Sequence, residues 1–187
     1  MEATASHRDM SWEDFLAWEE GREGRFEYIQ GEVFDMTGTT DRHNIVAMNL
    51  AFWLRQQLRG TPCHTFMSDV QVRVAAADAA FYPDVVVTCD ADDAVSRRVK
   101  HAPVLVAEVL SESTAGYDTG RKFHAYRALP SLRGYLLVDP EHPGVELFRR
   151  TDDDRWLVET YAAGDTVALP ELAIDLPVDS LYVDLLE

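Results

Sequence analysis

Short runs of apolar residues in the second half of the chain predict the middle of a sheet. The runs within residues 84–88 and 103–110 hold few polar positions, which is typical of strands that are buried on both faces. Apolar stretches at residues 135–138, 145–149 and 156–161 predict three further strands, the last of them in a hairpin.

The first 80 residues carry signals for two helices, a hairpin and another strand. Ser11 opens a capping-box pattern, Gln30 and Gly31 suit a two-residue hairpin turn, and Asp41 can cap a longer helix. In chain order we expect a helix over residues 11–20, a hairpin over 26–34, a helix over 41–59, a strand over 65–74 and a soft connection over 75–80.

A helix is expected from the polar stretch at residues 111–114 to about Leu129, because Pro130 cannot continue it. At about 100° per residue, Asp118 and Lys122 share a face with small and apolar positions. Lys122 is therefore expected to point toward the sheet, and a solvated pair with Asp118 is the alternative. Helices mixed with strands in this order predict a mixed α/β sheet with flanking helices.

Length and composition fit one domain with one sizeable core. The chain has 187 residues, of which 47% are hydrophobic, and we expect a single domain over 1–187 with its core at about 10–183. No apolar stretch is long enough to span a membrane, and residues 1–15 lack the apolar core of a signal peptide. Cys63 and Cys89 have no disulfide-framework spacing, so we expect small core residues in a reducing cytoplasm.

The net charge of −16 argues against a nucleic-acid partner, because an acidic surface repels phosphate. The charge is unevenly spread. Residues 97–150 hold nine Lys and Arg against six Asp and Glu, a net charge of +3, and the remainder holds eight against 27, a net charge of −19. One interpretation is that the acidic residues form a solvated surface that keeps the protein soluble. The other is that a metal, a partner subunit or a narrow cleft supplies the positive potential that a nucleic acid needs.

Glu108 is the only charge in the apolar run at residues 103–110. An ionised carboxylate in a buried strand is costly unless a cation or metal compensates it. Asp84 heads the preceding buried run, and Lys122 lies on the helix that follows Glu108. Two carboxylates on neighbouring strands with a lysine suit a divalent metal and a water that attacks a phosphodiester. The alternatives are a structural ion pair for Glu108 and a backbone role for Asp84 after Pro83.

Three further residues are weaker candidates for the same site. Glu27 alternates with Phe26 and Tyr28, so it either faces the site, as a third carboxylate for a hard cation, or is exposed on the hairpin. His43 has no partner at metal-binding spacing, so it is either a capping or packing histidine or, from its place near the start of a helix, a residue of the site. Ser111 is more suited to helix capping or a phosphate contact than to nucleophilic attack, because no histidine base is placed for it.

Several strings in order along the chain resemble the Uma-type restriction endonuclease family of the PD-(D/E)xK nuclease-like superfamily. The similarity extends over about residues 10–183. The strings that carry it are 26–32 with His43, then 82–87, 107–114, 117–123, and Tyr126 to Tyr135 with 136–140.

The resemblance implies a restriction-endonuclease-like α/β fold with a mixed central sheet. It implies a site of Asp84, Glu108 and a lysine that has migrated to the helix, Lys122, with Glu27 as the family's N-terminal glutamate. We name His43, Ser111 and Tyr126 as supporting residues.

From the residues and the resemblance we expect an endonuclease that uses Mg²⁺ or Mn²⁺ to cut DNA, with Asp84 and Glu108 as metal ligands. A homodimer would allow both strands of a duplex to be cut. A non-catalytic nucleic-acid- or protein-binding module on the same fold, and a metal hydrolase of a small phosphorylated substrate, are the alternatives.

Overall fold

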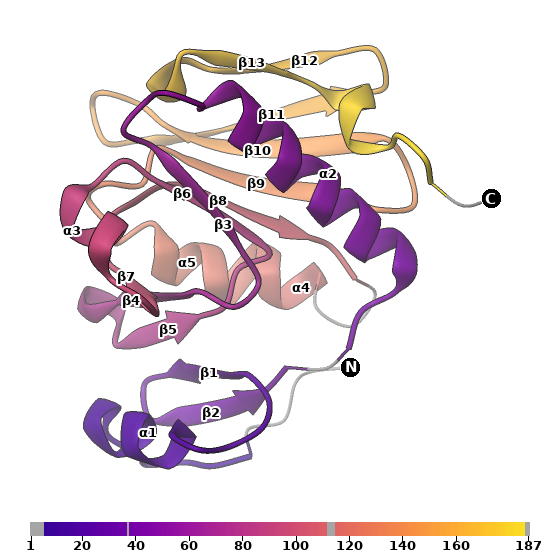
Figure 1. Ribbon diagram of the computed structural model, residues 1–187. Helices are drawn as coiled ribbons and strands as arrows, with labels where there is room; N and C mark the ends of the chain where they lie inside the picture. Colours follow the sequence, from indigo (N-terminus) through magenta and orange to yellow (C-terminus); the bar gives the residue numbers. More distant parts are fainter. Residues whose placement is uncertain (1–5, 37, 112–114, 186–187) are drawn as a thin grey trace.

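The computed structural model describes residues 6–36, 38–111 and 115–185, and Figure 1 shows the arrangement of its helices and strands. The α-helices of these residues are α1 (Trp12–Glu19), α2 (Asp41–Gln57), α3 (Ala91–Val95), α4 (Ala115–Tyr117) and α5 (Phe123–Tyr126). Single turns of 3₁₀-helix lie at Ala75–Ala77, Pro170–Leu172 and Val178–Leu181. The expected mixture of helices and strands is confirmed.

A six-stranded mixed sheet forms the centre of the molecule. In spatial order its strands are β11 (Trp156–Ala162), β10 (Gly144–Arg150), β9 (Gly134–Asp139), β8 (Pro103–Val109), β6 (Val85–Thr88) and β3 (His64–Met67). Of these pairs β8 and β9 run parallel, because the helical segment between them crosses over one face, and the other pairs are antiparallel.

A second, five-stranded sheet lies beside the first. Its strands in order are β2 (Glu32–Asp35), β1 (Phe26–Ile29), β5 (Ala79–Phe81), β4 (Gln71–Val74) and β7 (Val99–Lys100). The predicted hairpin of β1 and β2 is present, and both turn residues, Gln30 and Gly31, have positive φ, as a two-residue turn between twisted strands requires.

Helices and sheets stack in layers that share apolar clusters. On one face of the six-stranded sheet, α2 packs on β6 and β8, and the hairpin of β12 (Thr166–Leu169) and β13 (Ile174–Pro177) contributes to the same apolar cluster (Figure 1). On the other face, α5 packs between the two sheets, where Tyr126 meets Val106 of β8 and Phe81 of β5 in one cluster. The outer face of β1 packs on α1 through Tyr28 and Phe15.

The expected strand at residues 65–74 is wrong as one element. It is two strands, β3 and β4, in different sheets, and the chain turns between them at Ser68, which has a φ of 51°. The soft connection predicted at residues 75–80 is also partly wrong, because Ala79 and Ala80 pair with β1 as part of β5.

The prediction that Asp41 caps α2 is wrong by one residue. Thr40, rather than Asp41, is the N-cap, and its hydroxyl accepts a hydrogen bond from the His43 amide at 3.2 Å. Asp41 is the first helical residue, where its negative charge favours the helix dipole. Both residues begin the helix, but through different interactions.

Residues 115–126 form the helix that the sequence predicts after β8, with one departure. Five residues, Asp118–Lys122, make a π-helical turn between α4 and α5. The helix ends at Tyr126, slightly before the predicted Leu129. The polar stretch expected to cap it lies mostly outside the described residues; Ser111 is described, and its carbonyl accepts the Ala115 amide at 3.0 Å.

The prediction of two unpaired cysteines is wrong. Cys63 and Cys89 form a disulfide, and both side chains pack, partly buried, against the apolar cluster between α2 and the six-stranded sheet. They flank β3 and β6, which pair with His64 opposite Thr88, so antiparallel pairing brings together residues that are 26 positions apart in sequence. In the part of the chain that the structure describes, no helix is long and apolar enough to cross a membrane.

The cap of α2 gives a test of this part of the fold. We expect Thr40→Ala to lower the free energy of unfolding by about 1 kcal/mol, because the His43 amide loses its acceptor. Asp41→Asn removes only a favourable charge at the first turn, so it should lower the free energy of unfolding by about 0.3 kcal/mol. Urea denaturation of both variants measures the difference, and an equal or reversed ranking would contradict the assignment of Thr40 as the N-cap.

Candidate active site

Alternation along β8 places Glu108 on the face that α5 covers. Leu105 and Ala107 belong to the cluster under α2, whereas Val106 packs in the cluster of α5 on the opposite face. Because residues two apart on a strand share a face, Glu108 lies on the side of Val106. Its side chain is 4% exposed.

Asp84 lies beside Glu108 at the start of β6. Val85 pairs with Ala107, so the antiparallel register sets Asp84 opposite Glu108. The Asp84 amide donates to Oε2 of Glu108 at 3.4 Å, and the Val109 amide donates to Oδ2 of Asp84 at 2.8 Å. Each carboxylate is thus held by the backbone of the other strand, which fixes the two acids next to each other.

Lys122 reaches Glu108 from the helix above the sheet. Its Nζ lies 3.2 Å from Oε1 of Glu108, 2.9 Å from Oε1 of Glu27 and 3.1 Å from Oδ1 of Asp118. The Lys122 side chain is 6% exposed, so the alternative of a solvated pair with Asp118 is wrong. Glu27, Glu108, Asp118 and Lys122 are called the Lys122 cluster below.

The π-helical turn sets two members of this cluster on one face of the helix. Asp118 and Lys122 begin and end the turn, and both side chains are buried. In a π-helical turn the backbone hydrogen bonds join residues five apart instead of four. The buried hydroxyl of Tyr135 on β9 donates a hydrogen bond to the Asp118 carbonyl at 2.9 Å. π-Helical turns inside α-helices are frequent at functional sites, and this one links the helix to the central sheet beneath it.

Glu27 enters the cluster from the other sheet. On β1, Tyr28 packs with Phe26 against α1, and alternation therefore turns Glu27 to the opposite face, toward the helix between the sheets. The side chain is 5% exposed. The alternative of an exposed hairpin charge is wrong for Glu27.

Electrostatics in the Lys122 cluster follow from three acids that share one amine. Burial alone would lower the pKa of Lys122, but the carboxylates of Glu108, Glu27 and Asp118 outweigh it and hold that pKa well above its ordinary value. Burial raises the pKa of Glu108 well above its ordinary value, and it raises the pKa of Glu27 as well, although Lys122 opposes both shifts. The ammonium is charged, and the cluster holds an excess of acid.

His43 pairs with Asp84 from the first turn of α2. Its Nε2 lies 3.2 Å from Oδ2 of Asp84, and the two side chains are 7% and 17% exposed. Burial lowers the pKa of His43, but the hydrogen bond and charge of Asp84 outweigh this and raise that pKa above its ordinary value. Both residues line a cavity of about 550 Å³, so Asp84 is the acid of the site that borders the opening.

Tyr126 and Ser111 occupy different positions around the site. Tyr126 is fully buried against Phe81 and Tyr135, with ring centroids 4.9 and 5.6 Å away. Burial, followed by the charge of Glu108, raises the pKa of Tyr126 well above its ordinary value. Ser111 is half-buried between β8 and α4.

Asp118 is a member of the cluster that sequence reasoning did not assign to the site. The signal was present, since Asp118 lies four residues before Lys122 on the helix face that carries the small and apolar positions. A buried face makes a solvated ion pair improbable there. Burial of this helix face was inferred for Lys122 alone. Inferred for Asp118 as well, it places both residues in the site.

Asp84 and Glu108 are the pair with the right chemistry for a hard divalent cation. Among the described residues, no group of three or more His, Cys, Asp or Glu side chains could hold a metal ion by itself. Mg²⁺ usually keeps several waters and is bound through one or two carboxylates together with substrate phosphates. Two adjoining carboxylates, of which Asp84 lines a cavity and Glu108 is buried behind it, fit this manner of binding.

Comparisons with known proteins bear on this arrangement of fold and side chains. A family model described as "Putative restriction endonuclease" (Uma2) matches residues 12–179. The uncharacterized protein slr1290 of Synechocystis sp. is 35% identical over 92% of this chain and 91% of its own length. A second uncharacterized protein of the same organism, sll1609, is 33% identical over 84% of this chain and 90% of its own.

The chain belongs to the Uma2 family. A crystal structure described as a putative nuclease belonging to DUF820 from Anabaena variabilis has a TM-score of 0.76 with it, at 17% identity, over 92% of this chain and 97% of the other. This likeness, together with the mixed sheet flanked by helices, confirms the expected restriction-endonuclease-like fold.

The imbalance of charge in the Lys122 cluster gives a second prediction. We expect Lys122→Met to lower the free energy of unfolding by about 3–5 kcal/mol, because it leaves three buried acids without their cation. Glu27→Gln removes one of the three competing acids, so we expect it to cost less than about 1 kcal/mol. Urea denaturation at neutral pH measures both values. A Glu27→Gln loss as large as that of Lys122→Met would contradict the idea of surplus acid.

Proposed function

We propose that this protein is a divalent-metal-dependent endonuclease that hydrolyses phosphodiester bonds in DNA. The observation that carries the proposal is the buried amine of Lys122 beside Glu108, with Asp84 hydrogen-bonded to the same glutamate. Membership in a family described as putative restriction endonucleases supports the same activity. Fold alone is a weaker argument than the side chains of the site.

Asp84 and Glu108 would hold Mg²⁺ or Mn²⁺, with water and a substrate phosphate as the other ligands. The cation would supply positive charge that stabilises the anionic transition state and activates water for attack. Amide hydrogen bonds from the neighbouring strands orient both carboxylates. This preorganisation matters because a ligand displaced by about 1 Å can lose most of its effect.

Lys122 would donate hydrogen bonds to the attacking water or to the phosphoryl oxygens as negative charge develops on them. Its ammonium form suits this role, because the surrounding acids hold it charged. Glu27 and Asp118 lie 2.9 and 3.1 Å from Nζ and fix the amine in place. His43, at 3.2 Å from Asp84, would orient that carboxylate toward the cavity.

A non-catalytic binding module on the same fold is the second candidate. The net charge of −16 favours a module of this kind that binds a protein, since strong binding of a long nucleic acid normally relies on a basic surface. The two candidates differ in what the acids do. An enzyme needs Asp84 and Glu108 to bind a cation, whereas a binding module needs them only for packing.

Cleavage of circular DNA tests the enzyme directly. With Mn²⁺, wild type should nick circular DNA, and Glu108→Gln should reduce the rate at least about a hundredfold, because it removes a metal ligand at the reacting phosphate. Glu146→Gln, an exposed glutamate on β10, is the matched control and should retain the wild-type rate. Gel analysis of supercoiled and single-stranded circles measures the rates. Equal nicking by wild type and Glu108→Gln would remove Glu108 from the mechanism.

Metal binding separates the two candidate functions. We expect Mn²⁺ to raise the melting temperature of the wild type and to give a calorimetric binding signal, because a ligand that binds only the folded state stabilises it. Asp84→Asn should weaken that binding at least about tenfold, and Asp69→Asn, at another acid that lines the cavity, should leave it unchanged. Absence of Mn²⁺ binding by the wild type would favour the binding module.

A further inference from the structure

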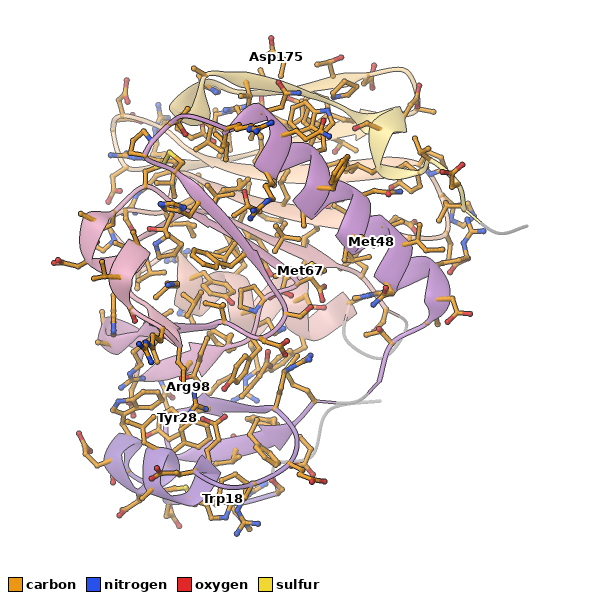
Figure 2. The ribbon with its side chains drawn as sticks, viewed as in Figure 1. Trp18, Tyr28, Met48, Met67, Arg98 and Asp175 are labelled. Atoms are coloured by element: carbon orange, nitrogen blue, oxygen red, sulfur yellow. A yellow bond between two sulfur atoms is a disulfide. The ribbon has the colours of Figure 1, made fainter. Side chains whose placement is uncertain are left out.

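The cavity beside Asp84 is bounded by three separate segments. The segments that flank β1 and β2 form one wall, the turn between β3 and β4 forms the opposite wall, and the first turns of α2 close the end where His43 lies. Met67, labelled in Figure 2, lines the wall formed by the β3–β4 turn. A volume of about 550 Å³ falls within the range of about 300–1,000 Å³ that holds a small organic ligand. This is the scale of a nucleotide rather than of a double helix.

An ion pair joins the two walls of this cavity. Nη2 of Arg25 lies 2.5 Å from Oδ1 of Asp69, and the two side chains are 43% and 79% exposed. Arg25 precedes β1, and Asp69 lies in the turn between β3 and β4. The pair therefore narrows the opening that leads to Asp84, and because it is exposed it exchanges readily for another partner.

Charge in the cavity favours few phosphate contacts. Of its described lining residues, Arg25 is the one Lys or Arg, against the two acids Asp69 and Asp84. Double-stranded DNA carries one negative charge per about 1.7 Å of its axis, and proteins hold it with many Lys and Arg contacts. An overall charge of −16 opposes such a long contact. A short flexible strand can present one phosphate to Arg25 and leave the others in solvent.

We infer that the substrate enters this site as single-stranded DNA, with Arg25 as the residue that binds its phosphate after release from Asp69. Cleavage of that strand rests on the proposed nuclease function, whereas the preference for single strands rests on the cavity and Arg25. A guanidinium binds a phosphate with paired hydrogen bonds, so Arg25 suits the exchange better than a lysine would. Asp69 keeps Arg25 at the opening when no substrate is bound.

Binding and cleavage are measured separately to test this inference. Fluorescence anisotropy in EDTA compares wild-type binding of one labelled 40-nucleotide sequence as a single strand, as a blunt duplex and as a duplex with a central single-stranded gap. We expect the single strand and the gapped duplex to bind at least about tenfold more tightly than the blunt duplex. Equal or tighter binding of the blunt duplex overturns the inference, whether or not the protein cleaves DNA.

Cleavage of the same three DNAs with Mn²⁺ gives the second reading. Cuts confined to the single strand and the gap support the inference, and blunt duplex cut as fast as the single strand contradicts it. If none of the three DNAs is cut, the proposed nuclease function fails, and the binding measurement still decides the preference for single strands.

Two variants test the role of Arg25. Arg25→Gln should weaken single-strand binding about tenfold, and should reduce the slope of log affinity against log salt by about 0.7, the loss of one phosphate contact. Asp69→Asn frees Arg25 and should tighten the same binding. Arg155→Gln is the matched control, because Arg155 forms an exposed pair with Asp153 at 2.7 Å in the turn between β10 and β11. An effect of Arg155→Gln as large as that of Arg25→Gln, or weaker binding by Asp69→Asn, contradicts the assignment.

Discussion

One buried ammonium holds together the three layers that meet at the candidate site. Lys122 lies on the helical layer, Glu108 on the six-stranded sheet and Glu27 on the five-stranded sheet, and both acids lie within 3.2 Å of its Nζ. Desolvation of such ions costs several kcal/mol each, so a buried ion cluster is weak evidence for stability. An apolar core of similar volume would stabilise these layers at least as well. Stability alone therefore does not account for a buried amine among three acids.

Local periodicity was enough to predict the part of this site that lies around β8. The apolar run around Glu108 showed a buried strand, and the helical spacing of Lys122 showed which way its amine points. Glu27 was harder, because alternation along β1 fixes that neighbouring residues face opposite ways but not which face is buried. That choice depends on α1, which packs on Tyr28 and leaves Glu27 toward the helix. The information is tertiary and lies outside the hairpin.

The remaining errors share this cause. The alternation at residues 65–74 continues through the turn at Ser68, since Phe66 and Val70 pack against the same cluster as β4, so the pattern holds no sign that the chain changes sheet. The pairing of Cys63 with Cys89 depends on the register of β3 and β6, which residue spacing alone does not reveal. Strand pairings within the five-stranded sheet, such as that of β1 with β5, are likewise non-local. Sequence periodicity defines elements and faces, whereas register defines partners.

Excess acid at the site and excess acid over the whole chain have different consequences. Within the Lys122 cluster, three buried acids share one amine, and burial raises the pKa of Glu27 and of Glu108, so a divalent cation at Asp84 and Glu108 would favour their ionised forms. Over the surface, a net charge of −16 repels a polyanion at long range. Salt screens that repulsion beyond about 8 Å under physiological conditions, so attraction has to act at contact. If the protein is the nuclease proposed above, its attraction for an anionic substrate would have to act at the site itself, and Arg25 lies at the opening of the cavity beside Asp84.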